Sequence, residues 1–185
     1  MEYAVIFLPL LGTIIGYLSK YFGDIASQLL TTLTVCIAAI LSLAIFYNGV
    51  VYDHYENYII FEWIRSGDFQ INWAINIDPL SSIMLVVVTF ISALVHIYSI
   101  GYMSHDPFKP RFMSYLSLFT FAMLVLVVSD NFIQLFFGWE GVGLSSYLLI
   151  GFWYKKESAN NAAIKAFIVN RIGDFGLAIG IFLIF

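Results

Sequence analysis

The feature that most constrains this chain is a long apolar run with one acid near its middle. Residues 131–153 read NFIQLFFGWEGVGLSSYLLIGFW, and Glu140 is the only charged residue among them. At about 1.5 Å per residue, a helix of this length spans a hydrocarbon core of roughly 30 Å. Glu140 then lies near the midplane, where an ionised carboxylate costs on the order of 2.5–3.5 kcal/mol. The run therefore predicts a membrane helix that carries a functional acid.

The composition of the whole chain favours the same class of protein. Hydrophobic residues make up 61% and charged residues 11% of the sequence, against about half and a quarter in soluble domains. Lipid offers no hydrogen-bonding partner to an open backbone, so the membrane spans are predicted to be helices. The single cysteine, Cys36, excludes an internal disulfide and any cysteine-cluster metal site within the chain. The sequence also lacks the glycine-rich signatures of dinucleotide and nucleoside-triphosphate sites.

Hydrophobic patterning predicts an all-α polytopic membrane protein, built as a single membrane domain over residues 1–185. Its six transmembrane helices are predicted at residues 3–18, 25–47, 79–101, 112–128, 132–152 and 161–185. Asp78 and Pro79 supply an N-cap and a first-turn proline for the third of them. The last helix is still apolar where the sequence stops, so we expect the chain to be the N-terminal part of a longer protein.

The longest polar stretch, residues 48–78, separates the second and third predicted helices. Residues 58–64 are rich in β-formers, and residues 65–68, Arg-Ser-Gly-Asp, are a turn signal. Residues 69–77 then alternate apolar and polar side chains with period two. This stretch therefore predicts a short β-hairpin in an outer loop, outside the bilayer.

Basic residues in the loops predict the orientation. The loops on one side hold five lysines and arginines, namely Lys20, Lys109, Arg111, Lys155 and Lys156, whereas the other side holds only Arg65. Cytoplasmic loops are the basic ones, so the N-terminus and the hairpin are expected outside. The membrane is expected to be a bacterial inner membrane, or the mitochondrial inner membrane if the gene is organelle-encoded.

The last predicted helix carries three charges, Lys165, Arg171 and Asp174. Lys165 lies roughly 6 Å from the surface and can snorkel. Glu140 and Asp174 reach similar depths, roughly 13 and 20 Å from opposite surfaces. Arg171 and Asp174 are three residues apart and can form a structural ion pair. Glu140 has no such partner in its own helix, so it must be neutral, paired across helices or hydrated.

These positions lead to a hypothesis about protons. Burial favours the neutral carboxyl group and a nearby cation favours the carboxylate, so a balanced group can load and release a proton. We take Glu140 as such a carrier, the alternative being a purely structural charge. His96 is the only intramembrane histidine and is either a bundle-facing structural residue or a relay member. A bis-histidine haem is rejected because His54 and His105 are predicted in loops on opposite sides.

Four stretches carry a resemblance to a known family: WAINIDPLSSIM, YMSHDP with a following RF, DNFIQLFFGWEGVGLSSYLLIGFWY and SANNAAIKAFIVNRIGDFG. Over about residues 60–180 the chain resembles chain 5, or subunit L, of proton-pumping NADH:quinone oxidoreductase, respiratory complex I. The large subunit of multisubunit sodium/proton antiporters is the nearest alternative. A structural membrane subunit without its own proton path is a third possibility.

The resemblance implies an antiporter-like, proton-translocating subunit of an enzyme that couples NADH oxidation by quinone to proton pumping. It implies Glu140 as the main proton-transfer residue, with Lys165, Arg171 and Asp174 at matching family positions. It also implies that the chain holds no redox centre or metal, since the flavin and iron–sulfur clusters belong to partner subunits. The expected partners are other membrane-arm subunits, the lipid bilayer, protons and water, and not nucleic acid.

Overall fold

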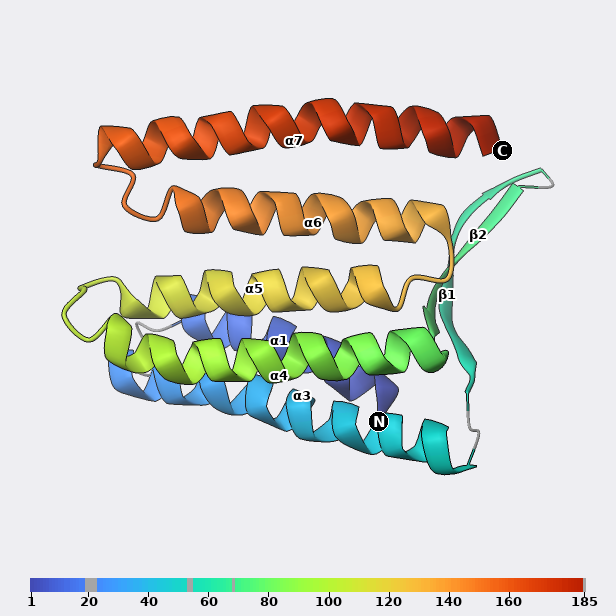
Figure 1. Cartoon of the computed structure of the whole chain (residues 1–185), viewed down its shortest axis with the longest axis horizontal. Helices are drawn as coiled ribbons and strands as arrows, with labels where there is room; N and C mark the ends of the chain where they lie inside the picture. Colours follow the sequence, from blue (N-terminus) through green and yellow to red (C-terminus); the bar gives the residue numbers. More distant parts are fainter. Residues whose placement is uncertain (19–22, 53–54, 68, 185) are drawn as a thin grey trace.

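The computed structural model describes residues 1–18, 23–52, 55–67 and 69–184, which form six helices and a two-stranded hairpin (Figure 1). Lys20 and His54, which entered the predictions above, lie outside these described residues. The order of elements confirms a predominantly helical protein with a hairpin after its second helix. The elements are α1 (Glu2–Tyr17), α3 (Asp24–Tyr52), β1 (Asn57–Ser66), β2 (Phe69–Asn76), α4 (Pro79–Tyr102), α5 (Lys109–Val127), α6 (Phe132–Ile150) and α7 (Glu157–Ile184).

Five of the described helices, α3 to α7, are long and apolar enough to cross a membrane. Helix α1 is apolar but shorter, with 16 residues, or about 24 Å of helix. Three boundaries differ from the predicted ones by more than two residues: α3 runs on to Tyr52, α5 begins at Lys109 and α7 begins at Glu157. In each case polar residues that were read as loop continue the helix, because a helix does not end where its apolar stretch ends.

Side-chain caps determine where two of the helices begin, α4 after the hairpin and α6 after α5. Asp78 accepts a hydrogen bond from the Ser81 amide at 2.6 Å, and Ser81 Oγ accepts one from the Asp78 amide at 2.8 Å. This reciprocal capping box starts α4 at Pro79, as the sequence predicts. Asn131 caps α6 in the same way, its Oδ1 accepting from the Gln134 amide at 2.8 Å. The cap at Asn131 therefore sets the position of Glu140 along α6.

The hairpin is fastened to the helices rather than free. Strands β1 and β2 pair antiparallel, and the turn between them uses Gly67 at φ +60°, a conformation that favours glycine. The buried side-chain amide of Gln134 in α6 pairs with the backbone of Ala74, donating at 2.7 Å and accepting at 3.1 Å. Ile71 and Ile75 of β2 are buried. The hairpin thus covers one end of the bundle and joins it to α6.

The helices are arranged so that α7 lies at one edge, beyond α6, which in turn lies beside α5 (Figure 1). Helix α1 packs against α3 and α5, and α4 packs against α3. The apolar core lies where α1, α3, α4, α5 and β2 meet; its buried members include Val5, Ile45, Ile75, Leu85 and Leu124. The site of interest is therefore outside this core, between the two edge helices α6 and α7.

Glycine allows α6 to approach α5 closely. A Cβ atom at Gly138 would lie 2.7 Å from both the backbone nitrogen and the Cα of Leu126 in α5, and one at Gly141 would lie 3.0 Å from the Ala122 Cβ. Such distances are too short for a side chain, so the crossing requires glycine at position 138. Gly138, two residues before Glu140 in α6, and Gly141, one residue after it, therefore serve the packing of α6 on α5.

Candidate functional site

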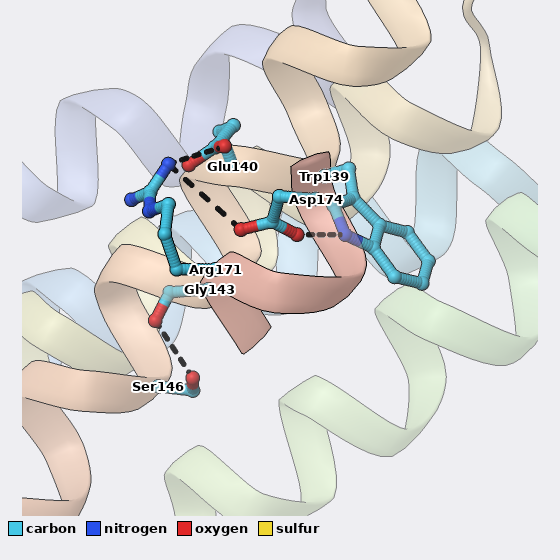
Figure 2. Close-up of polar contacts among 6 residues, drawn as sticks. All are labelled: Trp139, Glu140, Gly143, Ser146, Arg171 and Asp174. Atoms are coloured by element: carbon cyan, nitrogen blue, oxygen red, sulfur yellow. Dashed lines mark hydrogen bonds and ion pairs between the residues drawn. The ribbon is translucent and has the colours of Figure 1, made fainter. Parts of the chain in front are cut away.

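The acid in α6 faces two charged residues of α7 (Figure 2). Arg171 Nη1 lies 2.5 Å from Glu140 Oε1, and the same nitrogen lies 3.8 Å from Asp174 Oδ2. Of the three options that the sequence leaves open for Glu140, the structure has the pair across helices. The predicted ion pair between Arg171 and Asp174 is also present, and Glu140 is the closer of the two partners of Arg171.

The three side chains differ in exposure. The Asp174 side chain is 8% exposed, that of Glu140 24% and that of Arg171 52%. The guanidinium also lies over the Phe167 ring, 4.9 Å from its centroid. With both carboxylates ionised, two negative charges face a single positive one. The cluster then carries an excess negative charge that one proton would cancel.

Trp139 joins the cluster from the α6 side, next to Glu140 in sequence (Figure 2). Its indole Nε1 donates to Asp174 Oδ1 at 2.8 Å. Asp174 is therefore held between an indole N–H on one oxygen and the guanidinium on the other. Sequence reasoning missed this contact because its two residues are 35 positions apart and no local spacing signals it.

Lys165 is not part of the cluster. It is exposed and forms no ion pair with any residue that the structure describes. Six residues, or about one and two-thirds helical turns, separate it from Arg171, so it leaves α7 from a different side. Only three of the four predicted site residues, Glu140, Arg171 and Asp174, are brought together.

A cavity of about 210 Å³ opens beside Asp174, between α6 and α7. Its lining includes Trp139, Ser146, Asn170 and Asp174. Ser146 Oγ donates to the Gly143 carbonyl at 2.8 Å (Figure 2), which leaves its oxygen able to accept from water. A cavity of this size has room for several water molecules, which Ser146, Asn170 and Asp174 could hold by hydrogen bonds.

His96 faces the interior of the bundle and is fully buried. Its Nδ1 lies 2.8 Å from the Ser92 carbonyl oxygen, which can only accept, so the ring proton is on Nδ1. Its Nε2 then accepts from Ser117 Oγ at 3.0 Å. Both ring nitrogens are satisfied in the neutral form, as expected of a structural histidine. A relay role for His96 stays a prediction.

The described residues do not gather into an obvious metal site. Among them, no three His, Cys, Asp or Glu side chains lie close enough together to hold a metal ion. The expectation that flavin and iron–sulfur clusters are held by other subunits stays a prediction.

The fold and the site together define a polytopic membrane protein with an acid–arginine–acid cluster between two apolar helices. Two family models match it: "NADH-Ubiquinone oxidoreductase (complex I), chain 5 N-terminus" over residues 63–113, and "NADH:quinone oxidoreductase/Mrp antiporter, TM" over residues 129–185. The second match contains Glu140, Arg171 and Asp174. The chain belongs to the family of NADH:quinone oxidoreductase chain 5, called subunit L in bacterial relatives.

Individual relatives agree with this assignment. The chain is 52% identical to NADH-ubiquinone oxidoreductase chain 5 of Chondrus crispus, over 100% of this chain and 28% of the relative. It is 51% identical to NADH-quinone oxidoreductase subunit L of Rickettsia bellii, over 96% of this chain and 28% of the relative. The chain thus spans a little over a quarter of the length of these relatives, which are named as subunits of an enzyme complex.

The fold is similar to that of a solved respiratory complex. A chain of the membrane-bound sulfane sulfur reductase, an archaeal respiratory membrane complex, matches with a TM-score of 0.76 and 18% identity. The match covers 94% of this chain and 35% of that one. At this identity the likeness concerns the fold alone.

Proposed function

We propose that this chain carries protons within the membrane part of an NADH:quinone oxidoreductase, with the α6–α7 cluster as its proton-carrying site. The observation that supports this most strongly is that Glu140 and Asp174 share the guanidinium of Arg171. Two carboxylates and one cation accommodate one proton without leaving a net charge in lipid, where a charge is costly. The proton exchanges between the carboxyl groups and water, and Arg171 determines which carboxylate is stabilised.

The driving force is electrostatic. A cation about 4 Å from a carboxylate stabilises the ionised form by on the order of 4 kcal/mol at an effective dielectric of 20, and by about 1 kcal/mol or less where the pair is hydrated. Arg171 is half exposed, so its interaction with Glu140 lies between these limits. Movement of Arg171 away from Glu140 therefore removes an interaction that stabilises the Glu140 carboxylate.

Water reaches the charged cluster from the side of Asp174. The cavity between α6 and α7 has Asp174, Ser146 and Asn170 in its lining, whereas Glu140 is not part of that lining. A proton delivered through it meets Asp174 first, and Glu140 lies on the other side of the shared guanidinium. This order assigns Asp174 to proton entry or exit and Glu140 to storage.

The proposal leaves electron transfer to other subunits. NADH, flavin, iron–sulfur clusters and quinone are handled by partners in the assembled complex, and this chain supplies the proton step. We place the complex in a bacterial or mitochondrial inner membrane, with the N-terminus and the hairpin outside. The second family model is shared with Mrp antiporters, which favours sodium/proton antiport as the second candidate function.

The test replaces Glu140 by glutamine in the complete protein, assembled in its complex and reconstituted into vesicles. Proton uptake per NADH oxidised is expected to fall at least severalfold. The matched control is Glu62→Gln, on the exposed hairpin, which is expected to pump normally. Normal pumping by Glu140→Gln would refute the proposal. Pumping that requires sodium, with a sodium flux that the same variant abolishes, would favour the antiporter.

A further inference from the structure

Arg111, in the first turn of α5, is a cation that has no counter-ion in the part of the chain that the structure describes. No carboxylate oxygen of the described residues lies within 4.0 Å of its guanidinium. Its only hydrogen bond within the described residues goes from Nη2 to the Phe152 carbonyl at 3.3 Å, and its Nε is buried without a partner. A partly buried guanidinium ordinarily pairs with an anion.

The surroundings of Arg111 hold the cation in place without neutralising it. The rings of Phe108, Phe152 and Tyr154 lie 4.6, 4.8 and 5.6 Å from its Cζ. Ring faces attract a cation but carry no net charge. The acid of the preceding loop, Asp106, is engaged elsewhere, accepting from the Phe108 amide at 2.8 Å and from Trp153 Nε1 at 2.9 Å.

Arg111 lines a cavity of about 200 Å³ that has further polar groups around it. Three of them, the hydroxyls of Tyr115 and Tyr147 and the side-chain amide of Asn160, have no hydrogen-bond partner among the described residues. A guanidinium fork together with O–H and N–H donors on the residues lining one small cavity suits the chemistry of a phosphate group.

The position of the cavity indicates where such a phosphate comes from. Its lining joins the start of α5, the end of α6 and the start of α7, which lie together at one end of the bundle (Figure 1). The loop from α6 to α7 brings Trp153, Tyr154, Lys155 and Lys156 to the same end. Aromatic and basic side chains of this kind mark the headgroup level of a membrane. The positive end of the α5 dipole adds to the attraction for an anion.

We propose that Arg111 and this cavity bind the phosphate group of a membrane phospholipid. The guanidinium and the tyrosine and asparagine donors hold the phosphate oxygens, and the acyl chains run along the apolar outer faces of the helices. The bound headgroup supplies the missing counter-ion and ties the ends of α5, α6 and α7 together. The site is distinct from the charged cluster in the middle of α6 and α7.

The test uses the full-length protein, purified and delipidated in detergent, and native mass spectrometry to count bound lipids. Phosphatidylglycerol is expected to bind the wild type, and Arg111→Gln is expected to weaken that binding about tenfold or more. Arg111→Lys keeps the charge but loses the fork, and should lie between them. Arg65→Gln, which changes an exposed arginine of the hairpin at the other end of the bundle, is the matched control and should bind within about twofold of the wild type.

Two further arms keep the test decisive. Tyr147→Phe deletes one hydroxyl while preserving the ring that packs on Phe167, and a severalfold loss of binding is expected even if Arg111→Gln fails to fold. Inorganic phosphate is offered in place of lipid. Equal phosphatidylglycerol binding by the wild type, Arg111→Gln and Tyr147→Phe would overturn the site. Saturation by inorganic phosphate without any lipid binding would overturn the phospholipid assignment.

Discussion

The guanidinium of Arg171 lies against the carboxylate of Glu140, Nη1 to Oε1 at 2.5 Å, across the interface of α6 and α7. This contact is shorter than the one that Arg171 makes with Asp174, 3.8 Å, on its own helix. The pair therefore links α6 to α7, as does the hydrogen bond from Trp139 to Asp174. Arg171 is thus a counter-ion of Glu140 that a single substitution can remove.

Removing that partner is the first prediction. Arg171→Gln removes the cation that stabilises the Glu140 carboxylate across the helix interface. Glu140 then retains its proton, and proton uptake per NADH oxidised should fall about tenfold. Arg171→Lys, which keeps the positive charge, should retain a larger share of the wild-type proton uptake. Arg65→Gln, an exposed hairpin arginine 3.8 Å from Glu62, is the control. Equal pumping by Arg171→Gln and Arg65→Gln would argue against the electrostatic role.

The indole that holds Asp174 gives a second prediction. Trp139→Phe keeps an aromatic side chain but deletes the indole N–H that donates to Asp174 Oδ1 at 2.8 Å, a charge-assisted bond worth about 1.5–3 kcal/mol. Asp174 is then free to compete with Glu140 for Arg171, so pumping should fall severalfold while the thermal midpoint changes little.

A second tryptophan provides the matched control for that variant. Trp153 Nε1 donates to Asp106 Oδ2 at 2.9 Å in the loop region, so Trp153→Phe deletes a similar bond away from the cluster. It should pump normally. A loss of pumping of the same size in both variants would mean that Trp139 does not act through Asp174.

The crossing of α5 and α6 gives a prediction about stability. Gly138→Ala places a Cβ 2.7 Å from backbone atoms of Leu126, so the helices must separate, at a cost of about 1–3 kcal/mol. Gly180→Ala, where no atom lies within 4 Å of the added Cβ, should be neutral or slightly stabilising. Thermal unfolding in detergent compares the two. If Gly138→Ala matches Gly180→Ala, the described crossing is wrong.

The hairpin gives a prediction about pH. Burial, a hydrogen bond to Glu56 and the negative charges of Glu2 and Glu56 raise the pKa of Tyr58 to about 12, from an ordinary value of about 10. Because the folded state favours the neutral phenol, its contribution to stability is present below about pH 10. It should be lost as the pH rises from about 10 through about 12.

Denaturant unfolding of the wild type and Tyr58→Phe on both sides of pH 10 measures this loss. The wild type should lose more stability than Tyr58→Phe over the alkaline range. Tyr17→Phe, at the exposed end of α1, should follow the wild type. If all three proteins lose stability in parallel, Tyr58 is not the group responsible.

The sequence alone predicts those parts of the structure that depend on near neighbours in the chain. The apolar run around Glu140, the Asp78–Pro79 helix start and the i,i+3 placement of Arg171 and Asp174 are all local patterns, and the elements they predict are present. The alternation in residues 69–77 likewise predicts β2, because period two is readable in a short stretch.

The contacts that define the candidate site are not local. The Trp139–Asp174 bond and the Gln134–Ala74 pairing join residues 35 and 60 positions apart, and helix packing alone decides which faces meet. Lys165 also shows that the sequence alone does not predict which residues of a helix reach the site. It shares a helix with Arg171, yet its direction around that helix keeps it away from the acids.

The most direct test of the central claim follows the proton on Glu140 itself. Infrared difference spectra of the assembled complex, recorded as NADH is oxidised, should show a carboxylic-acid C=O band that appears or disappears during turnover. The proposal predicts that this band is lost in Glu140→Gln and retained in Glu62→Gln. A band that persists unchanged in Glu140→Gln would contradict it, as would the absence of any carboxylic-acid band in a wild type that pumps.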